Sequence, residues 1–300
     1  MAIEVEGLRD RIASAESLHS IVETMRTLAA VNIRRANQAT EAAGEYLRSV
    51  HLALYVALRE YRETQPARRN LSGGTVPTLL VLSSNQGLCG SFNERVTKHA
   101  LELGAKVAQE AGVEFSAIPF VCVGYRGADR LAFLGARVVS VFDAPSSVEA
   151  VGPLVRAIYS EVADRLEPGA RLLAVYNQTT SSSGFVESDL QLLPFEVERW
   201  RELPEGETPF ATIPMVSGRS AEAVLPDLVR ELLYIDLYRT LVESFAAENA
   251  ARLFSMQGAT ENIEELLAEL NAAYREARQD AITNELMDIL GGILATEEQS

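Results

Sequence analysis

The sequence predicts an α/β fold in which long N- and C-terminal helices form an antiparallel coiled coil, with a Rossmann-like α/β domain inserted between them. Two observations carry this prediction: proline-poor amphipathic stretches at both ends, and alternating strand and helix patterns in the middle. The predicted boundaries are 1–70 for the first helix, 74–215 for the α/β domain and 220–300 for the last helix. A chain of 300 residues with 47% hydrophobic content can build such cores.

The N-terminal helix is predicted over residues 3 to about 65, which contain no proline and, after Gly7, only Gly44 as a glycine. Pro66 and the loop 71–77 end it. At 1.5 Å per residue the helix would be about 90 Å long. Its apolar or small residues recur at steps of three and four, mostly without a break, at Leu8, Ile12, Ala15, Leu18, Val22, Met25, Ala29, Ile33, Ala36, Leu47, Val50, Leu54, Ala57 and Tyr61.

The C-terminal helix is predicted from Pro226, placed in its first turn, to about Leu294. A rod of roughly 100 Å cannot bury its apolar stripe alone. Pairing with the first helix is one solution; packing on the α/β domain or on a second copy of the chain are alternatives that periodicity leaves open. The stripe consists of Leu228, Leu232, Ile235, Tyr238, Val242, Phe245, Asn249, Leu253, Met256, Thr260, Ile263, Leu267, Leu270 and Tyr274.

The middle of the chain alternates between short apolar runs and helical patterns, which is typical of a largely parallel sheet. Strands are predicted at 78–82, 118–123, 137–142, 171–176 and 190–193. Helices are predicted at 93–111, 128–134 and 148–166. The stretch Pro194–Arg219 is rich in Pro, Gly and Glu and is predicted to loop back.

Charge and composition narrow the classes of partner. The chain has 27 Lys and Arg against 42 Asp and Glu, a net charge of −15. Nucleic acid and anionic lipid would repel such a chain, so we expect protein partners and no nucleic acid. The acidic N-terminus lacks the basic region of a signal peptide, and no apolar run reaches the ~18 residues of a membrane span. Cys89 and Cys122 are expected to be reduced thiols.

The sequence contains no recognisable catalytic, cofactor or metal motif. The segment Ser83–Ser91 follows a strand but matches neither G-x-G-x-x-G nor the P-loop. The glycines of Gly124–Gly127 are typical of a strand-to-helix turn. The three histidines, His19, His51 and His99, stand apart without ligand spacing. We therefore expect no cofactor, no metal and no catalytic residue.

Several segments together resemble the gamma subunit of F-type ATP synthases. The strongest are Glu248–Leu253, Met256, Ala259–Asn262 and Tyr274–Leu286, followed by Gly87, Leu88, Cys89 and Gly90 with Asn93. Weaker matches are Val123–Gly127, Tyr176–Gln178, Leu192–Pro194, and Met25, Ala29–Ala30 and Arg34–Ala36 on the first helix. They span almost the whole chain in the family's order, and only Pro204–Arg219 is unlike it.

The resemblance implies a mechanical, non-catalytic role. In that family the coiled coil is a central shaft inside a ring of alpha and beta subunits, and the α/β domain lies at the foot with the epsilon subunit and the membrane c-ring. Rotation of the shaft drives the beta subunits through their nucleotide states. The chain would then lie on the cytoplasmic face of the inner (plasma) membrane, as a peripheral part reaching the membrane only through the complex.

The resemblance also implies which residues face the alpha and beta subunits. Arg278, Gln279, Thr283 and Glu285 match the segment that meets the catch loops of beta. Met25 matches a family methionine that faces the beta lever region, and Arg252 and Met256 match the helix opposite it. The arginines Arg26, Arg34 and Arg35 complete this set. A solvated helix face is the alternative for the four residues matched to the catch-loop segment, and the seam between the helices is the alternative for Met25, Arg252 and Met256.

Two departures from the family pattern suggest a divergent or second F-type complex. Glu23 and Arg26 reverse the family's usual order of charges, and Asn32 replaces a common lysine. From Pro226 onward there are 15 acidic residues and 5 arginines. A nucleotide-binding α/β enzyme and an unrelated coiled-coil adaptor remain the alternative functions.

Overall fold

A computed structural model describes residues 2–64, 76–165, 171–180, 184–195, 200 and 221–297. The chain divides into two compact units. One, here called the helical unit, comprises Met1–Leu28 and Leu253–Ser300; the other, the sheet unit, comprises Ala29–Arg252. Helices α1 (Ala2–Thr64) and α5 (Ala221–Glu297) contribute residues to both units. Most of the loops predicted at 71–77 and 194–219 lies outside the described residues, and the three domain boundaries stay a prediction.

The sheet unit contains five strands in the order β3-β2-β1-β4-β5. Strands β1 (Thr78–Leu82), β2 (Pro119–Val123), β3 (Arg137–Phe142) and β4 (Leu172–Thr179) are parallel to their neighbours, and β5 (Phe185–Leu193) pairs antiparallel with β4. The prediction of a largely parallel sheet is confirmed. The fourth and fifth strands are longer than predicted because they pair with each other as far as Thr179 and Phe185.

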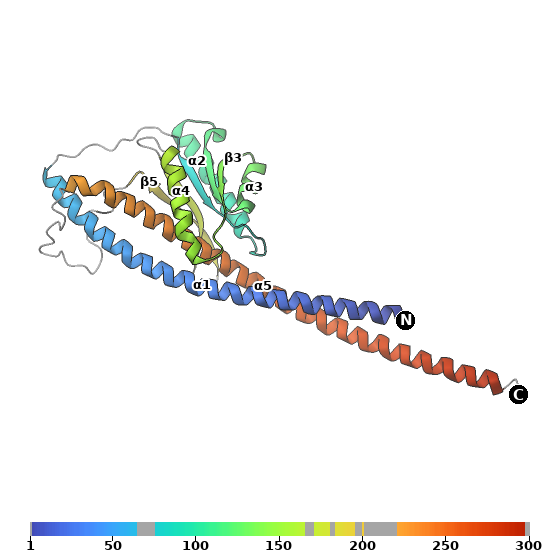
Figure 1. The fold of residues 1–300 in the computed structure, drawn as a ribbon. Helices are drawn as coiled ribbons and strands as arrows, with labels where there is room; N and C mark the ends of the chain where they lie inside the picture. Colours follow the sequence, from blue (N-terminus) through green and yellow to red (C-terminus); the bar gives the residue numbers. More distant parts are fainter. Residues whose placement is uncertain are drawn as a thin grey trace. The chain divides into compact units, whose positions relative to one another are not determined.

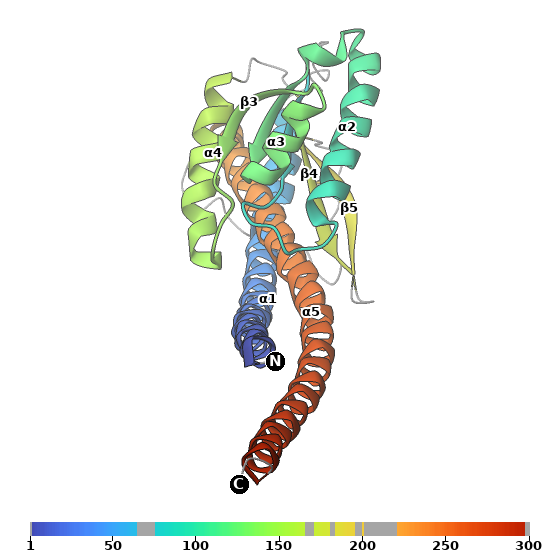
Figure 2. The ribbon, with the colours of Figure 1, turned by 90° about the vertical axis from the view of Figure 1, so that its right-hand side faces the viewer.

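Helices cover both faces of this sheet (Figures 1 and 2). Helices α2 (Phe92–Ala111) and α3 (Tyr125–Phe133) pack on one face over Leu79, Val81 and Phe120. Helix α4 (Val151–Arg165), which follows a 3-10 turn at Val148–Ala150, packs with α5 on the other face. The core on that face includes Leu80, Val121, Val155, Leu237 and Phe245. The alternation of strand and helix therefore produces the two-faced α/β layer that it predicts.

Within the sheet unit, α1 and α5 run antiparallel. Asn32 donates a hydrogen bond to Asn249 across 3.1 Å, and Tyr46 donates one to Glu231 across 2.7 Å, so partner numbers fall as α1 numbers rise. The same stretch of α5 also packs on the sheet. Pairing with the first helix and packing on the α/β domain, which were alternatives for α5, therefore occur together. One side of α5 is buried against α1 and another against the strands.

The helical unit also holds the two helices antiparallel. The His19 ring lies 3.4 Å from the Glu264 carboxylate, and Ala15, Met256, Thr260 and Leu270 are buried. The prediction that Leu18 lies in the seam is wrong, because its side chain is 55% exposed. The helix steps by four rather than three residues after Ala15, which turns His19 toward α5 and Leu18 toward solvent.

The start of α5 also differs from the prediction. The helix begins at Ala221, about one turn earlier, and Pro226 lies inside it. A proline in the second turn removes one hydrogen bond to the first turn, close to the end where backbone N–H groups lack helical partners. Among the described residues, no helix has the length and apolarity to cross a membrane.

Candidate functional surfaces

The strand order places a topological switch point between β1 and β4. In doubly wound sheets, ligands bind in the crevice at the carboxyl ends of the strands at this point. In this chain, the segment Ser83–Ser91 and the start of α2 lie there, after β1. Any nucleotide-binding activity of the sheet unit would be expected at this place.

Apolar side chains of the chain itself occupy this place. Cys89 and Phe92 form a buried cluster with Ala247 and Ala251 of α5, and Phe185 of β5 packs against it. Phe92 and Ala247 are completely buried. The alanines allow the helix to approach the loop closely, because each has only a Cβ. Helix α5 therefore takes the position at which other doubly wound domains bind a ligand.

The motif Gly87, Leu88, Cys89, Gly90 and Asn93 builds this contact. The Asn93 carboxamide accepts a hydrogen bond from the Ser84 backbone N–H at 2.9 Å and donates one to the Ser84 hydroxyl at 2.8 Å. Leu88 has a φ of 62°, a left-handed conformation unusual for leucine, and its side chain is 61% exposed. The turn thus points Cys89 inward and Leu88 outward.

The glycine turn after β2 serves packing as well. Gly124 has a φ of 92°, and a Cβ added there would lie 2.6 Å from Ser83. The Ser83 hydroxyl donates to the Val123 carbonyl at 2.7 Å and accepts from the Gly127 N–H at 3.1 Å. The glycines therefore join the loops after β1 and β2, as expected of a strand-to-helix turn.

Both cysteines are free thiols. Burial raises the pKa of Cys122 to about 12. Burial also raises the pKa of Cys89, with Glu248 adding to the rise while the Ser84 hydroxyl opposes it. A thiol that is buried and protonated is a poor nucleophile, so the two side chains act here as small apolar groups.

Arg252 forms a largely buried ion pair on α5. Its guanidinium donates to the Glu248 carboxylate at 2.6 Å, with 14% and 10% of the two side chains exposed. Burial raises the pKa of Glu248, and Arg252 opposes that rise. The pair fixes the direction of the guanidinium.

The other predicted contact residues fall into three groups by exposure. Arg34 and Arg35 of α1 are exposed in the sheet unit, and Arg35 lies 3.9 Å from Glu149. In the helical unit, Met25 and Arg26 are half-buried, and Arg26 donates to Glu23 at 2.6 Å. Met256 is buried, which agrees with the alternative that it belongs to the seam.

The predicted residues near the end of α5 are all exposed: Arg278, Gln279, Thr283 and Glu285. Of these four side chains, only that of Thr283 forms a hydrogen bond within the described part of the chain, and it donates to the Gln279 carbonyl at 2.9 Å. Exposed apolar residues lie beside them, namely Ile282, Leu286 and Met287. This surface is therefore accessible to a partner.

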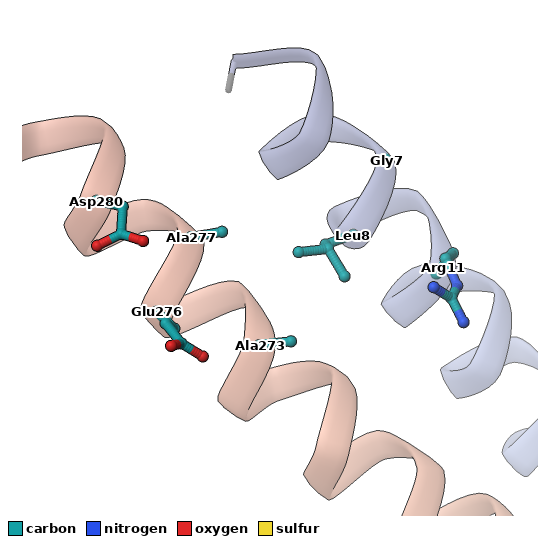
Figure 3. Close-up of a pocket in the computed structure, with 7 residues that line it drawn as sticks. All are labelled: Gly7, Leu8, Arg11, Ala273, Glu276, Ala277 and Asp280. Carbon is teal, nitrogen blue, oxygen red and sulfur yellow. The ribbon is translucent and has the colours of Figure 1, made fainter. Parts of the chain in front are cut away.

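Sequence reasoning missed two features of the helical unit. Ile21 and Leu28 of α1 are more than half exposed, as is Leu18, which gives the helix an outer apolar stripe. A groove of about 550 Å³ also lies between α1 and α5 (Figure 3). The stripe could have been found as a second set of three- and four-residue steps, whereas the groove has no such signal. It is lined by Gly7, Leu8, Arg11, Ala273, Glu276, Ala277 and Asp280.

The histidines and acidic residues give no metal centre within the described ranges. His99 pairs with Asp189 at 3.0 Å, His19 with Glu264, and His51 packs edge-on against the Trp200 ring. Each histidine therefore has a structural neighbour in a different part of the fold.

The chain is similar to known ATP synthase subunits over nearly its whole length. A family profile described as ATP synthase matches residues 4–296. The ATP synthase gamma chain of Salinibacter ruber is 32% identical, with 98% of each chain covered, and that of Nitrosomonas eutropha is 28% identical, with 96% of this chain covered and 98% of the relative.

Solved structures share the fold. The rotor of the Euglena gracilis mitochondrial ATP synthase covers 94% of this chain and 100% of its own, with a TM-score of 0.60 at 15% identity. A second structure of the same enzyme, containing OSCP, F1 and the c-ring, matches 99% of this chain and 95% of its own, with a TM-score of 0.63 at 16% identity.

Proposed function

Since this chain belongs to the family of ATP synthase gamma chains, we propose that it is the central-stalk rotor subunit of an F-type ATP synthase. It couples rotation of the membrane c-ring to nucleotide-state changes in the beta subunits, in ATP synthesis or in ATP-driven ion pumping. Its own role is mechanical rather than catalytic. Its partners are the alpha and beta subunits, the epsilon subunit and the c-ring, and it lies on the cytoplasmic face of the membrane within that complex.

One observation carries the proposal: the antiparallel pairing of two helices from opposite ends of a chain that matches the family over residues 4–296. The pair leaves polar and apolar side chains exposed on the helical unit, including Arg278, Ile282 and Leu286. Exposed apolar residues of this kind are typical of surfaces that become buried in an assembly.

The rival functions have less support. A nucleotide-binding enzyme would need an open switch-point crevice, and Phe92, Ala247 and Ala251 occupy it. A coiled-coil adaptor would require long helices, but not the match of the sheet unit to the same family. The filled crevice also supports a rotor, because it joins the sheet unit to the helix that would transmit torque.

Co-expression with the alpha and beta subunits of the same organism tests the proposal. Native mass spectrometry should find a ring of three alpha and three beta subunits that contains a single copy of this chain. A ring that forms repeatedly without the chain, while the chain elutes alone or as a dimer, would contradict the proposed function.

A further inference from the structure

We propose that the groove between α1 and α5 in the helical unit receives a lysine or arginine side chain from an alpha or beta subunit. This inference rests on the proposed function. It assigns a specific contact to the seven residues that line the groove, none of which belongs to the predicted contact set. It also gives the acidic surface of α5 a counterpart of opposite charge.

The groove exists because small residues face each other where the helices separate. Gly7 on α1 and Ala273 and Ala277 on α5 have at most one side-chain carbon each. Leu8 points across toward the two alanines (Figure 3). The resulting volume of about 550 Å³ exceeds that of any single side chain of the chain's own seam. An extended apolar stem can lie over Leu8 and the alanines, as the methylene chains of lysine and arginine do on apolar surfaces.

The charges on the α5 rim favour a cation. Glu276 and Asp280 are four residues apart, so they share one face of the helix. Both are exposed, and neither has an ion pair within the described ranges. Residues 253–297 contain nine acidic residues and only two arginines, so no surplus of positive charge on α5 offsets them. Two carboxylates beside an apolar floor match the ammonium or guanidinium at the end of an alkyl stem.

The groove lies on a different side of α5 from part of the predicted contact set. A helix turns by about 100° per residue. Positions 273, 276, 277 and 280 therefore cluster on one side, and Arg278 and Glu285 project from the opposite side. A partner side chain in the groove makes a contact additional to those predicted from the family resemblance.

Arg11 is the competing occupant from the chain itself. It lines the α1 rim of the groove and forms no ion pair among the residues that the structure describes. Because its positive charge lies opposite the two carboxylates, the α1 side of the groove is positive and the α5 side is negative. An incoming basic side chain is thereby directed to the α5 side. Closure of Arg11 over Glu276 would instead fill the groove without a partner.

A binding measurement tests the charge requirement. The full chain is titrated into the reconstituted alpha–beta ring, as wild type, as Glu276→Gln with Asp280→Asn, and as Glu265→Gln with Glu269→Gln. The last pair has the same spacing and charge on exposed positions outside the groove. At ~50 mM salt the groove variant should bind roughly tenfold more weakly, and at ~0.5 M the difference should largely disappear because salt screens exposed charges. The control should stay within about twofold of wild type.

A cross-link identifies the occupant. Ala277→Cys can be labelled with a benzophenone maleimide, since Cys89 and Cys122 are buried. In the assembled ring, the photoproduct should join residue 277 to an alpha or beta peptide whose lysine or arginine lies beside the cross-linked atom. A photoproduct within the chain at Arg11, or one on a peptide without a basic residue, would overturn the proposal.

The outcomes separate the two hypotheses. If the wild-type chain joins the ring and the groove variant binds equally well at low salt, the groove proposal is wrong and the rotor function stands. If the wild-type chain does not join the ring, the rotor function is wrong and the groove proposal falls with it.

Discussion

The same two helices are stabilised differently in the two units of the molecule. In the sheet unit, α5 buries every residue but Glu243 from Thr240 to Asn249, against α1 and against the strands. In the helical unit, the buried residues among the described side chains are Ala15, Met256, Thr260 and Leu270. The sheet unit thus has a complete core of its own, whereas the helical unit has a thin seam and exposed side chains that a partner can cover.

The largest expected effect is on the core that fills the switch-point crevice. Phe92→Ala removes a fully buried ring between α2 and α5, which should lower the free energy of unfolding by about 3–5 kcal/mol. Phe254→Ala makes the same change in the helical unit, where the ring is 70% exposed, and should cost less than about 0.5 kcal/mol.

Urea unfolding measures both variants through Trp200, the single tryptophan, which is buried in the sheet unit. An equal decrease in the free energy of unfolding in the two variants would contradict the difference between the cores of the two units.

A second prediction changes function without changing stability. Met25 is half-buried in the helical unit, so Met25→Lys can direct its charge to solvent in the free chain. In the assembled enzyme a cation in a close protein contact costs about 2–5 kcal/mol. Reconstituted vesicles should therefore hydrolyse ATP but pump fewer ions per ATP, and Met25→Leu should behave as wild type. Unchanged pumping per ATP in the lysine variant would remove Met25 from the contact set.

Local patterns predicted the elements of the fold well. Strands β1 and β3 match the predicted residues because mainly apolar runs end at turn residues. The first half of β5 was missed because this edge strand carries three consecutive polar residues, Glu187, Ser188 and Asp189, and only pairing with β4 makes this segment a strand. Leu18 was wrongly placed in the seam because the sequence pattern does not decide between a step of three residues after Ala15, to Leu18, and a step of four, to His19.

The functional surfaces were less predictable because they depend on tertiary contacts. The motif from Gly87 to Gly90 could be recognised from the sequence, but its packing against Ala247 and Ala251 joins residues far apart in the chain. The groove beside Leu8 depends on Ala273 and Ala277, and alanines in a helix are as readily explained by helix propensity. Small residues indicate a close contact or a gap only after both helices are placed.

The polar contacts between α1 and α5 should differ between the units in the same direction as the cores. Asn32→Ala removes the donor to Asn249, which is 1% exposed and would keep a buried acceptor without that bond. The expected cost is about 1–2 kcal/mol. His19→Ala removes a contact to Glu264, whose side chain is 64% exposed, and should cost less than about 0.5 kcal/mol. Comparable costs in urea unfolding would contradict the contrast between a buried and a solvated seam.

The smallest effect concerns an ion pair at the edge of the sheet unit, and it should depend on pH. Arg95 donates two hydrogen bonds to Glu187, at 2.5 and 2.8 Å, and lowers the pKa of that carboxyl from 4.5 to about 2. A carboxyl whose pKa is lower in the folded than in the unfolded state stabilises the fold at any pH at which it is ionised in both states. The contribution is therefore complete above pH ~4.5 and is lost as the pH falls toward about 2.

With 28% of the Glu187 side chain exposed, solvent reduces this contribution to about 1 kcal/mol. Glu187→Gln should thus be less stable than wild type at pH 7 and nearly equal to it close to pH 2, as followed by Trp200 fluorescence in urea. Glu102→Gln removes a more exposed carboxylate 3.9 Å from Lys98, and should show almost no difference at either pH. A Glu187→Gln deficit that persists unchanged at low pH would assign the loss to packing of β5 rather than to the charge on its carboxylate.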